Sequence, residues 1–155
     1  TDRRERIETL RKVVKAINST KSIIFINTKY DLEETFHKLE YHHYKVASIS
    51  GNKDKNEKKK AIDDFANGKI NYLLSTDVSA RGLQFDNIEA VINLNLPEDN
   101  TDYQHRAGRC GRNNQPGLCI SIITENELFK IKKLQKQFNI NMIQKRLYNG
   151  KLVSK

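Results

Sequence analysis

Five short apolar stretches recur along the chain and divide it into segments. They are rich in isoleucine and valine, and their apolar residues are mostly continuous rather than alternating with polar ones. Strands that are buried on both faces of a parallel sheet have this pattern. The sequence therefore predicts five strands, at residues 22–26, 45–49, 71–74, 90–94 and 118–123.

Segments with apolar residues at helical spacing separate the predicted strands. They cover residues 7–17, 29–41 and 55–67, a short helix after Thr101, and residues 125–138. Thr28 with Asp31, and Thr124 with Glu127, are spaced to cap two of these helices. Strands that alternate with helices are typical of an α/β three-layer sandwich with a mostly parallel sheet.

Composition and charge narrow the class of protein. The chain has 155 residues, enough for one domain with a proper core, and its 37% apolar and 30% charged residues indicate a soluble globular protein. No apolar stretch approaches the ~20 residues that cross a bilayer. The net charge of +9 favours a polyanionic partner. Nucleic acid is the favoured partner. Binding to an acidic membrane surface is less favoured, because the sequence has no basic helix with a strongly apolar face.

The two cysteines lie in different surroundings. Cys119 belongs to an apolar stretch and is expected in the core, whereas Cys110 lies among arginines in a predicted loop. Cationic neighbours stabilise a thiolate, so we expect Cys110 to be accessible and its pKa to be lowered. Two cysteines without a disulfide framework fit a reducing cytosol. The expected location is the cytoplasm, or also the nucleus if the source is eukaryotic.

Residues 105–112 concentrate three arginines, one histidine and two glycines in eight positions. Glycines let the backbone bend tightly, and arginines presented from a bend can converge on one anion through their guanidinium forks. A buried core would not tolerate this charge, so the segment must face water, an acidic partner or a phosphate. The alternative is a solvated basic loop without a ligand.

A second segment favours a phosphate as the ligand of residues 105–112. Residues 75–83 follow an apolar stretch and are predicted to form a strand end that opens into a small-residue turn. With residues 105–112, they resemble motifs V and VI of the DEAD-box ATP-dependent RNA helicases, whose usual forms are T-D-V-A-A-R-G-L-D and H-R-x-G-R-x-G-R. Residues 23–28 resemble motif IV of the same family, and residues 92–97 and Tyr103 match it further.

The order and spacing of these motifs resemble the second, C-terminal RecA-like domain of that family from about residue 5 to residue 138. We therefore expect a helicase C-terminal domain at residues 1–138. Residues 139–155 are basic and form a predicted C-terminal extension, which either packs on the domain or continues into a further segment.

The resemblance implies roles in ATP hydrolysis. Arg109 and Arg112 would act as arginine fingers at the γ-phosphate in the closed state, and His105 would touch an acidic motif of the partner domain. Arg81 and Gly82 would line the interdomain cleft. In α/β folds ligands sit at the carboxyl ends of strands, which is where these motif residues fall.

Several residues keep two interpretations. Arg106 would either take part in this chemistry or form a structural ion pair with Asp77. Thr28 and Thr76 are expected to bond RNA phosphates, but Thr28 also resembles a helix N-cap, and both roles can hold through different atoms. Phe25 is expected to support this loop from the core rather than to stack on a base. Contacts to the RNA backbone would be independent of base sequence and sensitive to salt.

The chain departs from the family pattern at two places. After the strand that ends near Gly51, the family usually has Gln-x-x-Arg, where this chain has Lys55 and Lys58. Lysine keeps the charge without the bidentate fork, so this segment is expected to contact RNA through point charges. Gln84 replaces an aspartate that is expected to bond the ATP ribose. A glutamine can still hydrogen-bond a hydroxyl without charge assistance, and Asp86 could substitute for it.

The chain contains neither a G-x-x-x-x-G-K-[ST] phosphate loop nor a D-E-A-D run. In the family both belong to the N-terminal RecA-like domain. ATP and Mg²⁺ are therefore expected to be held mainly there, and this chain is expected to have no metal site of its own, to be monomeric and to be inactive alone. The alternatives are a non-catalytic RNA- or protein-binding module with the same fold, against which the intact His105, Arg109 and Arg112 argue, and a DNA helicase of the RecQ type.

Overall fold

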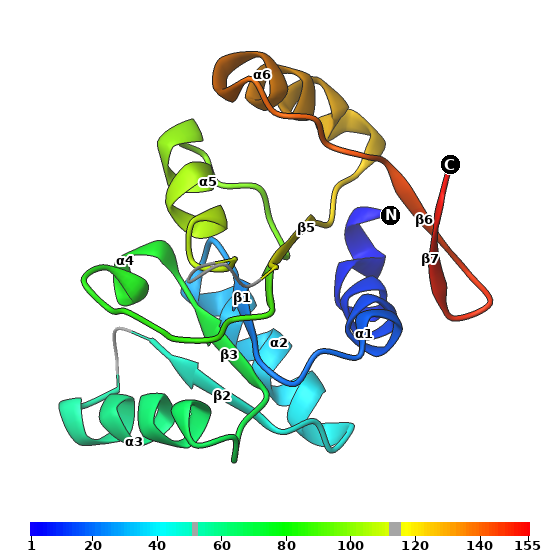
Figure 1. The fold of residues 1–155 in the computed structure, drawn as a ribbon. Helices are drawn as coiled ribbons and strands as arrows, with labels where there is room; N and C mark the ends of the chain where they lie inside the picture. Colours follow the sequence, from blue (N-terminus) through cyan, green and yellow to red (C-terminus); the bar gives the residue numbers. More distant parts are fainter. Residues whose placement is uncertain (51–52, 112–115) are drawn as a thin grey trace. The chain divides into compact units, whose positions relative to one another are not determined.

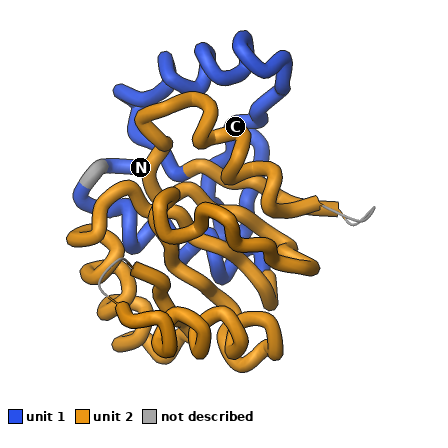
Figure 2. The backbone as a smooth tube through the Cα atoms, turned by 90° about the vertical axis from the view of Figure 1, so that its left-hand side faces the viewer, with its two compact units in different colours: residues 1–18, 122–155 blue, residues 19–121 orange. Residues whose placement is uncertain are grey.

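The computed structural model describes residues 1–50, 53–111 and 116–155 (Figure 1). The chain forms two compact units. Residues 19–121 make the larger one, and residues 1–18 together with 122–155 make the smaller one (Figure 2). The larger unit holds the sheet and the motif residues, and the smaller unit is assembled from the two end segments of the chain.

A five-stranded sheet in the order β2-β3-β1-β4-β5 forms the larger unit, and every strand pair in it is parallel. The strands are β1 (Ser22–Phe25), β2 (Val46–Ile49), β3 (Tyr72–Ser75), β4 (Ala90–Asn93) and β5 (Leu118–Ser121). The predicted strands and the α/β fold class are confirmed, and the strand ends differ from the predicted ones by at most two residues.

Helices connect these strands. In the described part of the larger unit they are α2 (Lys29–Tyr41), α3 (Lys55–Ala66), α4 (Asp77–Ala80) and α5 (Asn100–Ala107). Each begins after a Thr or Asp whose side-chain oxygen accepts a hydrogen bond from a backbone N–H of the first turn. Figure 1 shows α2 and α3 on opposite sides of the sheet. The small-residue turn predicted after β3 begins with a single turn of helix capped by Thr76, and Arg81 and Gly82 follow in a turn.

Burial follows the apolar pattern that predicts the strands. β1, β3 and β4 lie inside the sheet and are buried at every residue, whereas β5 lies at an edge and is only partly covered. Ile23, Leu73 and Val91 are neighbours across the three central strands. They pack with Phe65 of α3 and Ala80 of α4 in the main apolar cluster. Removal of this surface from water is the chief stabilising contribution.

The smaller unit joins the two end segments of the chain. Its elements are η1 (Arg3–Glu5), α1 (Arg6–Ile17), η2 (Glu125–Glu127), α6 (Leu128–Phe138), β6 (Lys145–Tyr148) and β7 (Lys151–Ser154). The guanidinium of Arg6 donates to the Glu127 carboxylate at 2.5 Å and to the Ile122 carbonyl at 2.8 Å. The predicted capping pair of Thr124 and Glu127 is confirmed, although a 3-10 turn precedes α6.

The basic segment 139–155 packs as an ordered extension within the smaller unit. β6 and β7 pair as an antiparallel hairpin, and β7 contacts α1. None of the helices in the described part of the chain combines the length and apolar character needed to span a membrane.

Candidate functional site

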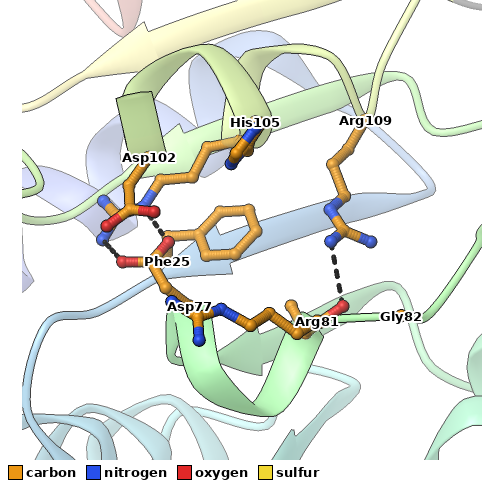
Figure 3. A pocket seen from close by; sticks show the side chains of 9 residues that line it. Phe25, Asp77, Arg81, Gly82, Asp102, His105 and Arg109 are labelled. Atoms are coloured by element: carbon orange, nitrogen blue, oxygen red, sulfur yellow. Dashed lines mark hydrogen bonds and ion pairs between the residues drawn. The ribbon is translucent and has the colours of Figure 1, made fainter. Parts of the chain in front are cut away.

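Polar side chains gather where β3, β1 and β4 end, because parallel strands bring their carboxyl ends to one edge of the sheet. A pocket opens there, between α4 and the C-terminal part of α5 (Figure 3). Its lining contains three arginines and two aspartates, so one positive charge remains after pairing. The lining residues are Phe25, Asp77, Ala80, Arg81, Gly82, Asp102, His105, Arg106 and Arg109.

Arg106 holds the base of the pocket together. Its side chain is 1% exposed, and its guanidinium forms a bidentate ion pair with Asp77, with both N–O distances at 2.7 Å. It also donates to the Asn95 carbonyl at 2.8 Å and to the side-chain oxygens of Asn27 at 2.8 Å and Asn93 at 3.3 Å. All five N–H donors of a guanidinium are thereby used. The structural ion pair with Asp77 is confirmed.

The arginine also lies over an aromatic ring. The guanidinium carbon of Arg106 is 5.1 Å from the centroid of the Phe25 ring, within the range of a cation–π contact. Phe25 is 1% exposed. Its predicted role as core support is confirmed, since no base could reach this ring.

Three asparagines that sequence reasoning did not single out complete the network. Besides binding Arg106, Asn27 donates to the Leu96 carbonyl at 2.8 Å, and its backbone N–H donates to the side chain of Asn95 at 3.1 Å. Asn93 is fully buried. The available signal was polar residues within or directly after apolar strands, because a buried amide requires partners.

Arg109 lies above this network and is held by backbone carbonyls. Its guanidinium donates to the Ala80 carbonyl at 2.9 Å and to the Leu83 carbonyl. Ala80 is the last residue of α4 and Leu83 follows the turn after it, where Gly82 has φ +75°, a conformation that is costly for residues with a Cβ. Gly82 therefore shapes the turn that receives Arg109.

The structure gathers four predicted ATP-site residues in one place and leaves two outside. Arg81, Gly82, His105 and Arg109 all line the pocket, and Figure 3 shows His105 and Arg109 across from Arg81. Gln84 and Asp86 are exposed and are absent from its lining. Arg112 lies outside the described residues.

The predicted RNA-contact residues follow the carboxyl ends of three adjacent strands. Thr28 follows β1 and Thr76 follows β3, and both hydroxyls cap helices by accepting from backbone N–H groups at 3.2 Å. The N-cap interpretation of Thr28 is therefore confirmed. Lys55 and Lys58 lie in the first turn of α3 after β2. Gly51 lies outside the described residues, and the RNA contacts themselves stay predictions.

The prediction of a lowered pKa for Cys110 is wrong. Burial raises the pKa of the Cys110 thiol above its ordinary value, and the thiol donates to the Ala107 carbonyl at 3.4 Å. Burial also raises the pKa of Cys119 to about 11, in keeping with its predicted place in the core. Arginines adjacent in sequence do not lower the pKa of Cys110 because desolvation is the larger effect there.

The pocket suits an anion better than a cation. Among residues 1–50, 53–111 and 116–155, no group of three or more His, Cys, Asp and Glu side chains could hold a metal ion. The pocket instead presents guanidinium groups, whose planar forks match phosphate oxygens. One of its two carboxylates, that of Asp77, is already neutralised by Arg106.

Comparison with known sequences agrees with this arrangement. Residues 5–114 match the family described as Helicase conserved C-terminal domain. The chain is 37% identical over 137 residues to the ATP-dependent RNA helicase FAL1 of Eremothecium gossypii, covering 88% of this chain and 34% of that protein. It is 31% identical over 152 residues to the DEAD-box ATP-dependent RNA helicase CshC of Bacillus cereus, covering 98% and 39%. The chain thus spans between a third and two fifths of the length of these curated relatives.

Solved structures give the same likeness. The C-terminal domain of the DEAD-box protein Dbp5 superposes with a TM-score of 0.83 at 30% identity, covering 91% of this chain and 83% of that chain. A DEAD box protein from the hyperthermophile Methanococcus jannaschii superposes with a TM-score of 0.82 at 31% identity, covering 91% and 39%.

Proposed function

The chain belongs to the DEAD-box ATP-dependent RNA helicases as their C-terminal RecA-like helicase domain, and on that premise we propose that it supplies half of a composite ATP-hydrolysis site and half of an RNA groove. The whole protein would unwind or remodel RNA when this domain closes on an N-terminal RecA-like domain. The observation that carries the proposal is the pocket in which Arg81, His105 and Arg109 meet beside the buried Arg106 and its partner Asp77.

ATP with Mg²⁺, when bound, supplies the transferable phosphoryl group, and we assign its binding mainly to the N-terminal domain. The part of this chain is to bring cations to the charge that develops on the γ-phosphate. Arg109 is positioned for this by two neutral carbonyls. A phosphate carries a full negative charge that a carbonyl lacks, so its Coulomb attraction for the guanidinium is stronger and it can draw Arg109 from those carbonyls.

The hydrogen-bond network around Arg106, called here the Arg106 clamp, holds the pocket in a fixed geometry. Arg106 links the ends of β1 and β4 to α4 through Asn27, Asn95 and Asp77. These side chains therefore position the catalytic arginines without touching the reacting atoms. Arg112 is proposed as a second finger on the family resemblance, and Gln84 as a ribose contact on the same ground.

The RNA contribution rests on the edge of the sheet. Thr28, Thr76 and the lysines at the start of α3 follow the carboxyl ends of β1, β3 and β2, so they form one row along the sheet. The solved structure of Dbp5 bound to RNA and ADP BeF3 resembles this chain with a TM-score of 0.82. Contacts through hydroxyls and point charges would grip the phosphate backbone without selecting a base sequence. A cytoplasmic location stays a prediction from the cysteine content.

The test is a comparison of arginine variants in the two-domain protein. Arg109→Ala and Arg112→Ala should each lower RNA-stimulated ATP hydrolysis by about three orders of magnitude, as losses of arginine fingers do, while RNA affinity changes little. Arg11→Ala, on α1, removes an arginine that pairs with Glu8 and serves as the matched control. Hydrolysis that survives while RNA affinity collapses would favour the non-catalytic RNA-binding module.

A further inference from the structure

The C-terminal part of the smaller unit carries unbalanced positive charge. From α6 onward, residues 128–155 contain no aspartate or glutamate. Their basic residues are Lys130, Lys132, Lys133, Lys136, Lys145, Arg146, Lys151 and Lys155. Like charges that are not neutralised within the fold repel one another and attract a polyanion. The proposed sheet-edge groove and ATP site use none of these residues.

The β6–β7 hairpin sorts its side chains onto two faces. Leu147 pairs directly with Leu152, and Tyr148 pairs directly with Lys151. Directly paired residues of an antiparallel hairpin share a face, and successive residues alternate between faces. Both leucines are partly buried, so theirs is the more covered face, and the other face carries one partly buried residue, Val153, opposite Arg146. Arg146 lies two residues before Tyr148 and therefore shares its face.

The open face presents an aromatic ring between two cations. The Tyr148 side chain is 59% exposed, and Arg146 and Lys151 are also exposed. The guanidinium carbon of Arg146 lies 5.7 Å from the centroid of the Tyr148 ring. Lys151 flanks the ring from the opposite strand. A rigid, exposed ring with a cation on each side offers a stacking surface and two phosphate contacts together.

We propose that this face of the hairpin binds single-stranded RNA, with a base stacked on Tyr148 and the flanking phosphates bound by Arg146 and Lys151. The inference rests on the proposed RNA-binding function and adds to it a second contact, outside the sheet-edge groove and made to a base as well as to the backbone. An acidic protein segment would satisfy the two cations but not the ring, because the electron-rich face of the ring repels a carboxylate. The occupant that uses all three side chains is a nucleic acid strand.

The absence of tryptophan from the chain makes the stacking directly measurable. In the 155-residue chain, Tyr148→Trp introduces a single tryptophan, whose fluorescence a stacked base quenches. Tyr41→Trp, at the end of α2 and with Tyr41 78% exposed, is the matched reporter. The probe is an unstructured single-stranded RNA, compared with an abasic strand of equal length and with an acidic peptide. RNA should quench the Tyr148→Trp variant and not the Tyr41→Trp variant, and the abasic strand should quench neither.

Affinity measurements separate the ring from the charges. Tyr148→Val keeps a strand-forming residue and should weaken RNA binding about fivefold, the lower end of the range for loss of one stacked base, whereas Tyr148→Phe should bind as the unchanged chain does. Lys151→Ala should weaken RNA binding and reduce its salt dependence. Lys69→Ala, an exposed lysine before β3, should do neither.

The outcomes distinguish this inference from the proposed function. RNA that binds the unchanged chain but neither quenches the Tyr148→Trp variant nor loses affinity in Tyr148→Val overturns the hairpin site and leaves the groove intact. Stronger quenching by the acidic peptide than by RNA overturns it in favour of a protein partner. No RNA binding by the unchanged chain overturns both proposals.

Discussion

At the residue scale, Arg106 shows how one buried charge can serve structure. A buried ion is tolerable only when all its polar groups are satisfied, and Arg106 meets this condition through Asp77 and three asparagines. The arrangement gives a definite geometry to three chain segments that are distant in sequence. Its value lies in placing the pocket, since a buried ion pair is not by itself strongly stabilising.

Removal of the Arg106 side chain should still destabilise the domain strongly, because it leaves its partners unpaired. Arg106→Ala leaves the Asp77 carboxylate and several acceptors unpaired, and we expect the free energy of unfolding to fall by about 3 to 5 kcal/mol. Arg106→Lys should rescue only part of this loss because an ammonium cannot make the bidentate pair. Urea denaturation measures the effect. Lys38→Ala breaks the exposed Lys38–Glu34 pair and should cost less than about 1 kcal/mol. A similarly small cost for Arg106→Ala would contradict the clamp.

The two thiols should react slowly at neutral pH. Because burial raises the pKa of Cys110 and raises that of Cys119 to about 11, few thiolates are present at pH 7. The alkylation rate should rise about tenfold per pH unit between pH 7 and 9 as the thiolate fraction grows. Cys110 should still be labelled first, since Cys119 is the more deeply buried of the two. Mass spectrometry of iodoacetamide-treated protein gives both rates. A Cys110 rate at pH 7 that matches a free cysteine would contradict the direction of the pKa.

Residue roles could be predicted from sequence only where the partner was also visible in a motif. The Arg106–Asp77 pair was one of two interpretations because both residues belong to recognised motifs. The asparagines also lie in matched motif segments, but their contacts with Arg106 depend on the register of β1 and β4, which the sequence does not show. The pKa of Cys110 was predicted in the wrong direction because proximity of charge along the chain says nothing about burial, which the folded structure decides.

At the element scale, the sheet was predictable and the hairpin could have been. The central strands appeared as continuous apolar stretches because both of their faces are buried. The hairpin had a clear signal too. Asn149 and Gly150 take φ values of +48° and +72°, the pattern of a type I′ turn, and Asn-Gly between strand-forming residues favours this turn. The basic composition of residues 139–155 is also typical of a tail, and it masks this signal.

The link between α1 and η2 should make stability depend on acid pH. Burial raises the pKa of Glu127, but hydrogen bonds from the Thr124 backbone and Arg6 outweigh it, so the net pKa lies below its ordinary value. A carboxylate with a lowered folded pKa contributes stability above its unfolded pKa, about 4.3. That stability is lost as the pH falls through the folded pKa.

Glu127→Gln tests this link. At pH 7 the variant should be less stable than the unchanged chain by about 1 kcal/mol, and the difference should shrink as the pH falls below about 4. Thermal unfolding at several pH values measures it. Glu34→Gln, at an exposed pair on α2, should show little difference at any pH. A Glu127→Gln difference that stays constant down to pH 3 would mean that the carboxylate charge is not responsible.

At the scale of the whole molecule, the isolated domain should bind RNA but should not hydrolyse ATP. The isolated chain should bind single-stranded RNA weakly and without sequence preference, and its affinity should fall with salt by about 0.7 logarithmic units per unit of log salt for each neutralised phosphate. It should hydrolyse no ATP, because its sequence has no phosphate loop. Filter binding and phosphate release measure the two properties. RNA-stimulated hydrolysis by this chain alone would refute the half-site proposal.

The assembly of the smaller unit from both end segments has a consequence for how the protein is made. The larger unit is one continuous stretch, residues 19–121, and can fold while the ribosome is still adding the rest. α1 leaves the ribosome before that stretch, but η2 and β7, which it contacts, come after it. At translation rates of about 5 to 20 residues per second, α1 waits roughly 5 to 20 s for them. During that interval its apolar residues Leu10, Val13 and Val14 lack those partners, so α1 stays exposed to chaperones and proteases until the C-terminal segments emerge.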